Sequence, residues 1–122
     1  MKLHLAQTPG QNRVSGYGAG YVAINGARHE THLLVTAEQV LCWNIDRFES
    51  LSAEHFRDVL ALDPEIVILG TGAAQRFPRP EQVRVLTAAG IGLEVMDSKA
   101  ACRTYNILMA EGRKVVAAIL VA

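Results

Sequence analysis

The chain has 122 residues, of which half are hydrophobic and a fifth are charged. This length and composition indicate one soluble globular domain covering residues 1–122, and they exclude a disordered chain. Twelve basic residues balance twelve acidic ones, so the chain lacks the basic excess that binding to nucleic-acid phosphates normally requires. We therefore expect no nucleic-acid partner.

The two ends of the chain and its cysteines indicate where the protein works. The N-terminal segment MKLHLAQTPG reaches Gln7 and Pro9 too early for the apolar region of a signal peptide, and it lacks the arginines of a transit peptide. The apolar run at residues 115–122 is far shorter than the ~20 residues of a membrane-spanning helix. Cys42 and Cys102 form no CxxC pair, which favours buried free thiols over a disulfide or a zinc site. We expect a cytoplasmic protein without membrane insertion.

The first part of the chain has a β pattern. Residues 21–24 followed by Asn25-Gly26 predict a hairpin, because Asn-Gly readily adopts the two positive φ angles of a type I′ turn. Apolar runs at residues 31–36 and 39–45 predict two more strands, so we expect three adjacent strands here. The glycines that precede them are interpreted as an irregular lead-in, with a phosphate-binding loop as the functional alternative: Gly16, Gly18 and Gly20.

The second part alternates between helix and strand. Ser52 is a good N-cap for a helix that ends before Pro64. The apolar run at residues 66–69 is typical of a strand covered on both faces. Pro80 suits the first turn of a second helix, which Gly90 ends.

A third helix and two strands complete the pattern. Residues 93–96 predict a strand, Asp97 or Ser98 caps the helix that follows, and residues 115–121 predict a closing strand that is apolar on both faces. Strands alternating with helices indicate an α/β fold with a layered sheet. We expect the closing strand to be central in that sheet.

The third helix has two distinct faces at 100° per residue. Ala101 and Tyr105 fall on one face, whereas Lys99, Arg103 and Asn106 fall on the opposite one. Thr104 and Asn106 are mediocre helix formers, so their presence needs a reason other than helix propensity.

The loop Gly70-Thr71-Gly72 directly follows the buried strand at residues 66–69. Ligands of open α/β sheets bind beyond the carboxyl ends of the strands, where glycines let backbone N–H groups approach an anion. If the strands at 66–69 and 93–96 are parallel neighbours, this loop lies beside the turn at Asp97. The alternative is a tight turn with a purely structural use. The candidate pocket comprises Gly70, Thr71, Gly72, Arg76, Asp97, Arg103, Thr104 and Asn106.

Known catalytic and metal patterns do not fit the sequence. Gln75 stands where a dinucleotide-binding fingerprint needs its third glycine. His29 and His32 are three residues apart in a β region, where they face opposite sides. Cys102 has no histidine beside it and is interpreted as a core residue. We therefore name no catalytic residue and expect neither a metal nor a cofactor.

Four motifs carry a family resemblance: Leu69-Gly70-Thr71-Gly72, GIGLEVMD at residues 90–97, AACRTYNIL at residues 100–108 and EGR at residues 111–113. They resemble the Mth-type family of domains of unknown function, and their amino-acid sequence is similar to that of the bacterial stand-alone members. The resemblance implies a three-layer α/β fold with a mixed central sheet, helices packed on it and an additional N-terminal antiparallel β layer. It implies no established catalytic activity. Mitochondrial members of the family are implicated in assembling respiratory complex I through protein partners.

Residues and resemblance together favour a non-enzymatic protein-binding or assembly module. The expected partner is a protein of unidentified kind, and self-association into a homo-oligomer stays open. The alternative is a small-molecule or anion-binding protein, or an enzyme, with its pocket at the Gly70-Thr71-Gly72 loop.

Overall fold

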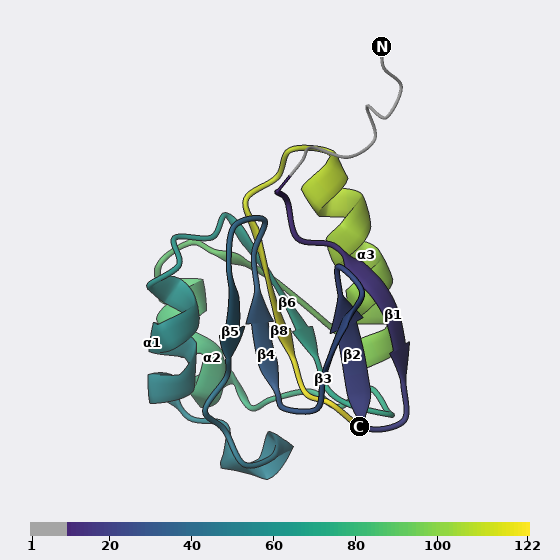
Figure 1. Ribbon diagram of the computed structural model, residues 1–122. Helices are drawn as coiled ribbons and strands as arrows, with labels where there is room; N and C mark the ends of the chain where they lie inside the picture. The colour runs from purple at the N-terminus through teal and green to yellow at the C-terminus, as the bar shows by residue number, and fades with distance from the viewer. Residues whose placement is uncertain (1–9) are drawn as a thin grey trace.

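The structure, a computed structural model, describes residues 10–122 (Figure 1). The N-terminal segment that bears on the expected location, residues 1–9, lies outside the described residues. The elements in chain order are β1 (Val14–Gly18), β2 (Tyr21–Ile24), β3 (Ala27–His29), β4 (Leu33–Val35), β5 (Val40–Cys42), the 3-10 helix η2 (Phe48–Ser50), α1 (Ala53–Leu60), β6 (Ile66–Gly70), α2 (Pro80–Ala88), β7 (Gly92–Met96), α3 (Ser98–Ala110) and β8 (Val115–Ile119).

The central sheet is mixed and has the strand order β5-β4-β8-β6-β7. β8 pairs parallel with β6 and antiparallel with β4, so it joins the parallel and antiparallel halves of the sheet. All five residues of β8 are buried, as expected for a strand covered on both faces. The prediction of a central closing strand is confirmed.

Figure 1 shows three layers, with α1 and α2 on one face of the central sheet and α3 and the sheet β1-β2-β3 on the other. Two hydrophobic cores lie between these layers. Because successive side chains of a strand point to opposite faces, Val116 and Ala118 of β8 join the core under α1 and α2, whereas Val115, Ala117 and Ile119 join the core under α3. The sheet β1-β2-β3 lies beside α3 and contributes Val14, Val22 and Ile24 to this second core. The predicted three-layer fold with its additional antiparallel β layer is confirmed.

The helix boundaries follow the predicted caps. Ser52 is the N-cap of α1, and its backbone N–H donates to Nδ1 of His55 at 3.1 Å. Pro80 is the first residue of α2, where its missing N–H would have no partner in the helix. Gly90 follows α2 with a φ of +75°, which explains why this helix stops there.

Gly16 and Gly18 of the glycine-rich stretch lie in β1, and Gly20 lies in the turn that follows it, so the interpretation as an irregular lead-in was wrong. β1 pairs antiparallel with β2 after an irregularity between Val14 and Gly16. Gly18 leaves room for the Tyr21 ring in this hairpin, because a Cβ at Gly18 would lie 2.5 Å from the ring. The composition obscured the strand, since glycine weakens strands in general.

The expectation of three adjacent strands was also wrong, because the chain changes sheets after β3. The Asn25-Gly26 turn is present, with φ angles of +53° and +88°, and it joins β2 to β3. β4 and β5 belong instead to the central sheet. β5 lies at the edge of that sheet, so Cys42 is exposed rather than buried. Cys102 is buried, as expected.

Removing residues 115–122 should abolish cooperative unfolding, because β4 and β6 then lose the strand that lies between them. Urea unfolding followed by circular dichroism tests this. The matched control lacks only residues 121–122 and retains all of β8, so it should still unfold in one cooperative transition. A cooperative transition in the longer deletion would contradict the central role of β8.

Candidate functional site

The Gly70-Thr71-Gly72 loop and the Asp97 turn lie side by side at the carboxyl edge of the central sheet. β6 and β7 are parallel neighbours, and Gly70 pairs with Met96 at their ends, which confirms the predicted juxtaposition. The connection after β6 leads to α2 on one face, whereas the connection after β7 leads to α3 on the other. Such a switch in direction is where open α/β sheets usually bind their ligands.

The space between the Gly70-Thr71-Gly72 loop and the first turn of α3, which we call the crevice, lies at this switch point. Hydrogen bonds within the protein close it. The N–H of Thr71 donates to the Met96 carbonyl at 2.9 Å, and the N–H of Ser98 donates to the Gly72 carbonyl at 2.9 Å. The N–H of Gly72 donates to Ser98 Oγ at 2.8 Å. Ser98 Oγ in turn donates to the Leu120 carbonyl at 2.6 Å. The first turn of α3 is thereby joined to the ends of β6, β7 and β8.

Thr71 organises the loop from inside. Its side chain is 2% exposed, and its Oγ1 lies 2.7 Å from the Ala74 carbonyl and 3.2 Å from the Met96 carbonyl. The same oxygen accepts the N–H of Arg76 at 3.0 Å. The Thr71 hydroxyl is therefore engaged within the protein, as are the Thr71 and Gly72 amides.

The two glycines of the loop have different reasons to be glycine. A Cβ on Gly70 would lie 3.0 Å from both Ala101 Cβ and Ser98 Oγ, so Gly70 allows α3 to approach the sheet closely. Gly72 has open space around it, but its φ of +93° lies in the left-handed region. The missing Cβ of Gly70 and the positive φ of Gly72 therefore both have structural reasons that need no ligand.

Asp97 caps α3, as predicted. Its Oδ1 accepts the N–H of Ala100 at 2.9 Å. A carboxylate at this position also lies at the positive end of the helix dipole. One oxygen of Asp97 is therefore engaged in the cap.

Arg76 lies on the other side of the loop, against η2. Its guanidinium carbon is 4.3 Å from the centre of the Phe48 ring, and its Nη1 is 2.7 Å from Glu49 Oε2. A backbone hydrogen bond and the hydrogen bond from Arg76 lower the pKa of the exposed Glu49 carboxyl. The structure thus places Arg76 away from the crevice between Gly72 and Asp97.

The three remaining residues of the predicted pocket lie further along α3. Asn106 Oδ1 accepts the N–H of Val14 at 2.9 Å, and Asn106 Nδ2 donates to the Val14 carbonyl at 2.8 Å. Arg103 Nη1 donates to the Tyr17 hydroxyl at 3.1 Å, and Thr104 is half-buried on the same helix. The helix face opposite the core is therefore covered in part by β1.

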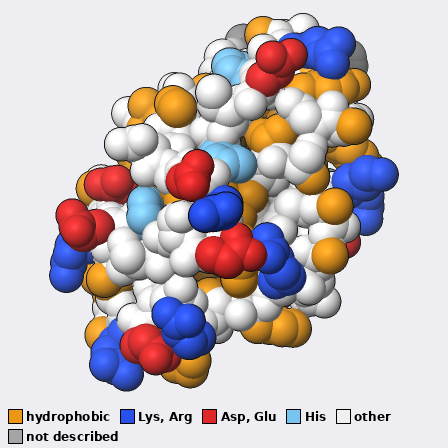
Figure 2. All heavy atoms as spheres, turned by 90° about the horizontal axis from the view of Figure 1, so that it is seen from below, with side chains coloured by type: hydrophobic (Ala, Val, Ile, Leu, Met, Phe, Trp, Pro, Cys, Tyr) orange, Lys and Arg blue, Asp and Glu red, His pale blue; other side chains and the backbone are white. Residues whose placement is uncertain are grey.

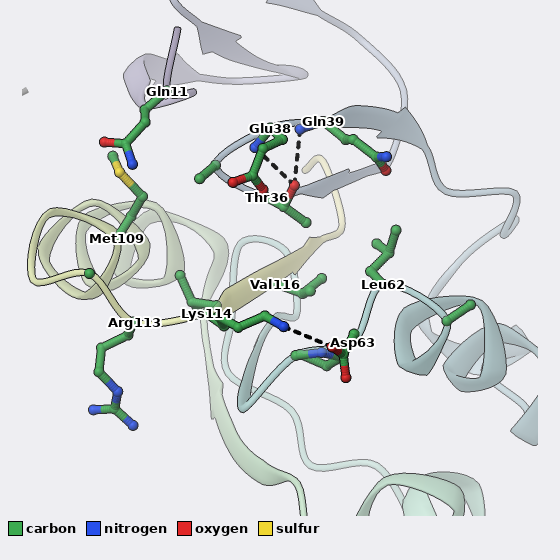
Figure 3. Close-up of a pocket in the computed structure, with 15 residues that line it drawn as sticks. Gln11, Thr36, Glu38, Gln39, Leu62, Asp63, Met109, Arg113, Lys114 and Val116 are labelled. Atoms are coloured by element: carbon green, nitrogen blue, oxygen red, sulfur yellow. Dashed lines mark hydrogen bonds and ion pairs between the residues drawn. The ribbon is translucent and has the colours of Figure 1, made fainter. Parts of the chain in front are cut away.

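A hollow of about 430 Å³ lies at the opposite end of the molecule, among loops at the amino ends of β6 and β8 (Figure 3). Leu62, Met109 and Val116 line it with apolar surface. Figure 3 shows Lys114 extending toward Asp63, whose Oδ2 lies 2.7 Å from Nζ. This hydrogen bond lowers the pKa of Asp63 and raises that of Lys114. Lys114 and Asp63 therefore neutralise each other's charge in an ion pair.

The carboxyl edge carries two further hollows, of about 410 Å³ and 500 Å³, on either side of residues 72–73. Viewed from this end, Figure 2 shows acidic and basic side chains interspersed rather than gathered into a patch of one sign. The first hollow includes Tyr17, Tyr21 and Lys99, which the sequence did not single out. Tyr17 was missed because β1 was not recognised as a strand, whereas Tyr21 and Lys99 lie on predicted elements and belong to no motif.

His32 and Cys102 have roles within the fold. His32 joins two segments, since its Nδ1 accepts the N–H of Val121 at 2.9 Å and its Nε2 lies 3.1 Å from the Asp46 carbonyl. Burial raises the pKa of the Cys102 thiol to about 11, which disfavours the reactive thiolate. Among residues 10–122, no group of three or more His, Cys, Asp or Glu side chains could hold a metal ion. Within the same residues, every helix is too short or too polar to cross a membrane.

Replacing Asn106 with alanine should lower the free energy of unfolding by about 1–3 kcal/mol, because the N–H and C=O of Val14 both lose their partner. The exposed Asn44 supplies the matched control, and Asn44→Ala should change stability little. Urea unfolding measures both variants, and hydrogen exchange at the Val14 amide reports the local loss. Unchanged protection of that amide would contradict the role assigned to Asn106.

Gly70→Ala should destabilise the protein by about 1–3 kcal/mol, because the added methyl group overlaps Ser98 and Ala101. Gly92→Ala is the control, since a Cβ there would meet Ile66 at an ordinary 3.6 Å. Thermal unfolding distinguishes the two variants. Equal stability of both would mean that α3 has room to move away from β6.

Comparison with known proteins places these features in a family. The profile described as "Protein of unknown function (DUF498/DUF598)" matches residues 14–120. The "13 kDa major membrane protein" of Francisella tularensis subsp. holarctica is 35% identical over 106 residues, covering 85% of this chain and 86% of that protein. Bovine "NADH dehydrogenase [ubiquinone] 1 alpha subcomplex assembly factor 3" is 31% identical over 109 residues. That match covers 88% of this chain, which spans 59% of the bovine protein's length.

A solved structure agrees with the fold. The solution structure of a Bordetella pertussis protein, described as an Mth938-like domain, has a TM-score of 0.84 and 36% identity to this chain. The match covers 99% of this chain and 92% of that one. The chain therefore belongs to the DUF498/DUF598 family of proteins of unknown function and has the Mth-type fold that its motifs indicate.

Proposed function

We propose that the protein is a non-enzymatic protein-binding or assembly module that contacts its partner through the loop after β6. The observation that carries this proposal is the position of Phe77, which is 72% exposed on that loop. Aromatic and arginine side chains dominate the binding energy of many protein interfaces. Phe77 directly follows Arg76, so the loop offers both kinds of side chain together.

Contacts of the residues that precede Phe77 hold the loop in place. Gln75 Nε2 donates to the Val95 carbonyl at 2.9 Å, and Arg76 packs on Phe48 and pairs with Glu49. Thr71 closes the beginning of the loop through the bonds described above. A loop that is already ordered loses little conformational entropy on binding, which favours affinity.

The relatives support the same proposal by analogy. The bovine relative is named as an assembly factor of NADH dehydrogenase. By this analogy we propose that the partner is a protein subunit awaiting assembly. The cytoplasmic location stays a prediction. The engagement of Thr71, Gly72 and Ser98 within the fold weighs against the alternative of a small-anion site at the loop. Self-association through Phe77 would make the partner a second copy of the chain.

Phe77→Ser should abolish partner capture without loss of stability, because an exposed side chain contributes little to folding. The protein is immobilised, exposed to lysate of its native host, cross-linked and analysed by mass spectrometry. Ile107 is 59% exposed on α3, and Ile107→Ser is the matched control that should retain the partner. Sedimentation of the purified protein identifies self-association.

Two results would contradict the proposal. One is a partner recovered equally with both variants, since the loop would then not be the contact. The other is a metabolite that stabilises the protein reproducibly in a thermal-shift screen while no protein partner is recovered. This second result would favour the small-molecule alternative.

A further inference from the structure

We propose that the hollow of about 410 Å³ between the β1–β2 hairpin and the start of α3 binds a free α-amino acid with an apolar side chain. Its volume lies within the ~300–1,000 Å³ of ordinary small-molecule sites. It lies beyond the carboxyl edge of the sheet, beside the switch point where α/β proteins bind ligands. The hydrogen bonds around Ser98 close the crevice below it, so a ligand would rest above the crevice rather than enter it.

The walls of the hollow suit an apolar side chain. Tyr17 and Tyr21 come from the hairpin, Val22 follows them in β2, and Ala73 and Val121 complete the apolar surface. Much of the lining is therefore hydrocarbon or aromatic ring, which favours burial of apolar surface.

Both tyrosine rings are fixed before any ligand arrives. The Tyr21 ring lies between Gly18, where a Cβ would be 2.5 Å from it, and the Arg28 guanidinium, 3.7 Å from its centre. The Tyr17 hydroxyl accepts a hydrogen bond from Arg103 at 3.1 Å. Because ring positions are set by contacts within the protein, binding requires little further ordering.

Two opposite charges at the start of α3 also line the hollow. Asp97 and Lys99 both border it, yet within residues 10–122 they form no ion pair with each other or with another side chain. Asp97 uses Oδ1 for the helix cap and retains its other oxygen. We place the ammonium of the α-amino acid toward Asp97 and its carboxylate toward Lys99.

The proposal is tested with L-phenylalanine as the probe, titrated into ¹⁵N-labelled protein up to about 10 mM, a range that detects even weak millimolar binding. The amides of Ala19, Gly72 and Lys99 should shift in a saturable way. 3-Phenylpropanoate lacks the ammonium and phenethylamine lacks the carboxylate, so each should bind about fivefold or more weakly, as expected for the loss of one partly exposed ion pair.

Variants assign the two charges. Asp97→Asn retains a helix-capping oxygen, and Lys99→Gln retains the length of much of the side chain. Each should weaken L-phenylalanine binding by about fivefold. The controls are Lys114→Gln, at the opposite end of the molecule, and Asp58→Asn, on α1; both should bind like the wild type.

Three outcomes would overturn the proposal: no saturable shift at these amides, equal binding of 3-phenylpropanoate or phenethylamine, or wild-type affinity in both charge variants. The three-compound comparison uses the wild-type protein, so it decides the question even if a variant does not fold. The proposal is independent of the protein-binding function. Phe77→Ser should leave L-phenylalanine binding unchanged, and failure of either proposal can therefore be recognised separately.

Discussion

The hydroxyl of Ser98 is the point on which the carboxyl edge of the sheet depends. It accepts a hydrogen bond from the Gly72 N–H and donates one to the Leu120 carbonyl. The Ser98 N–H donates a hydrogen bond to the Gly72 carbonyl. One residue thus ties the loop after β6, the first turn of α3 and the end of β8 together. Its side chain is buried, and an unsatisfied buried polar group is costly. The three segments are therefore held in one arrangement.

This arrangement decides what the carboxyl edge can do. In a Rossmann-like sheet the amides at the switch point are available to a ligand phosphate. Here the amides of Thr71 and Gly72 are already satisfied, and the first turn of α3 closes against the loop. The surface that remains consists of an ordered loop carrying Phe77 and the hollow beside the hairpin. The contacts proposed at this edge accordingly rely on side chains rather than on backbone donors.

Local sequence signals were sufficient for the second half of the chain. The Asp97 cap, the Pro80 helix start and the juxtaposition of β6 with β7 follow from capping preferences and from the geometry of parallel strands. These features depend on neighbours in sequence or on one crossover connection. Such features can be predicted because the residues that cause them are close together in the sequence.

The first half depended on partners far away in sequence. β1 is a strand because it pairs with β2 and because Asn106 binds the backbone of Val14; neither cause is visible in the glycine-rich stretch itself. The division between β3 and β4 likewise follows from pairing of β4 with β8. The residues of the candidate pocket lie at separate places in the structure because their partners, too, are far away in sequence. Asn106 and Arg103 were grouped with the loop, but their partners are Val14 and Tyr17.

The place of β8 in the sheet has a kinetic consequence. The pairs β5-β4 and β6-β7 do not adjoin one another; each is completed only when β8 inserts between them. Ladder formation between Leu33 and Ile119 must therefore close a very long loop before it gains any hydrogen bond. Topologies dominated by such non-local pairing fold slowly. Until β8 is in place the inner edges of β4 and β6 are unpaired, and they are the segments through which nascent chains would associate wrongly.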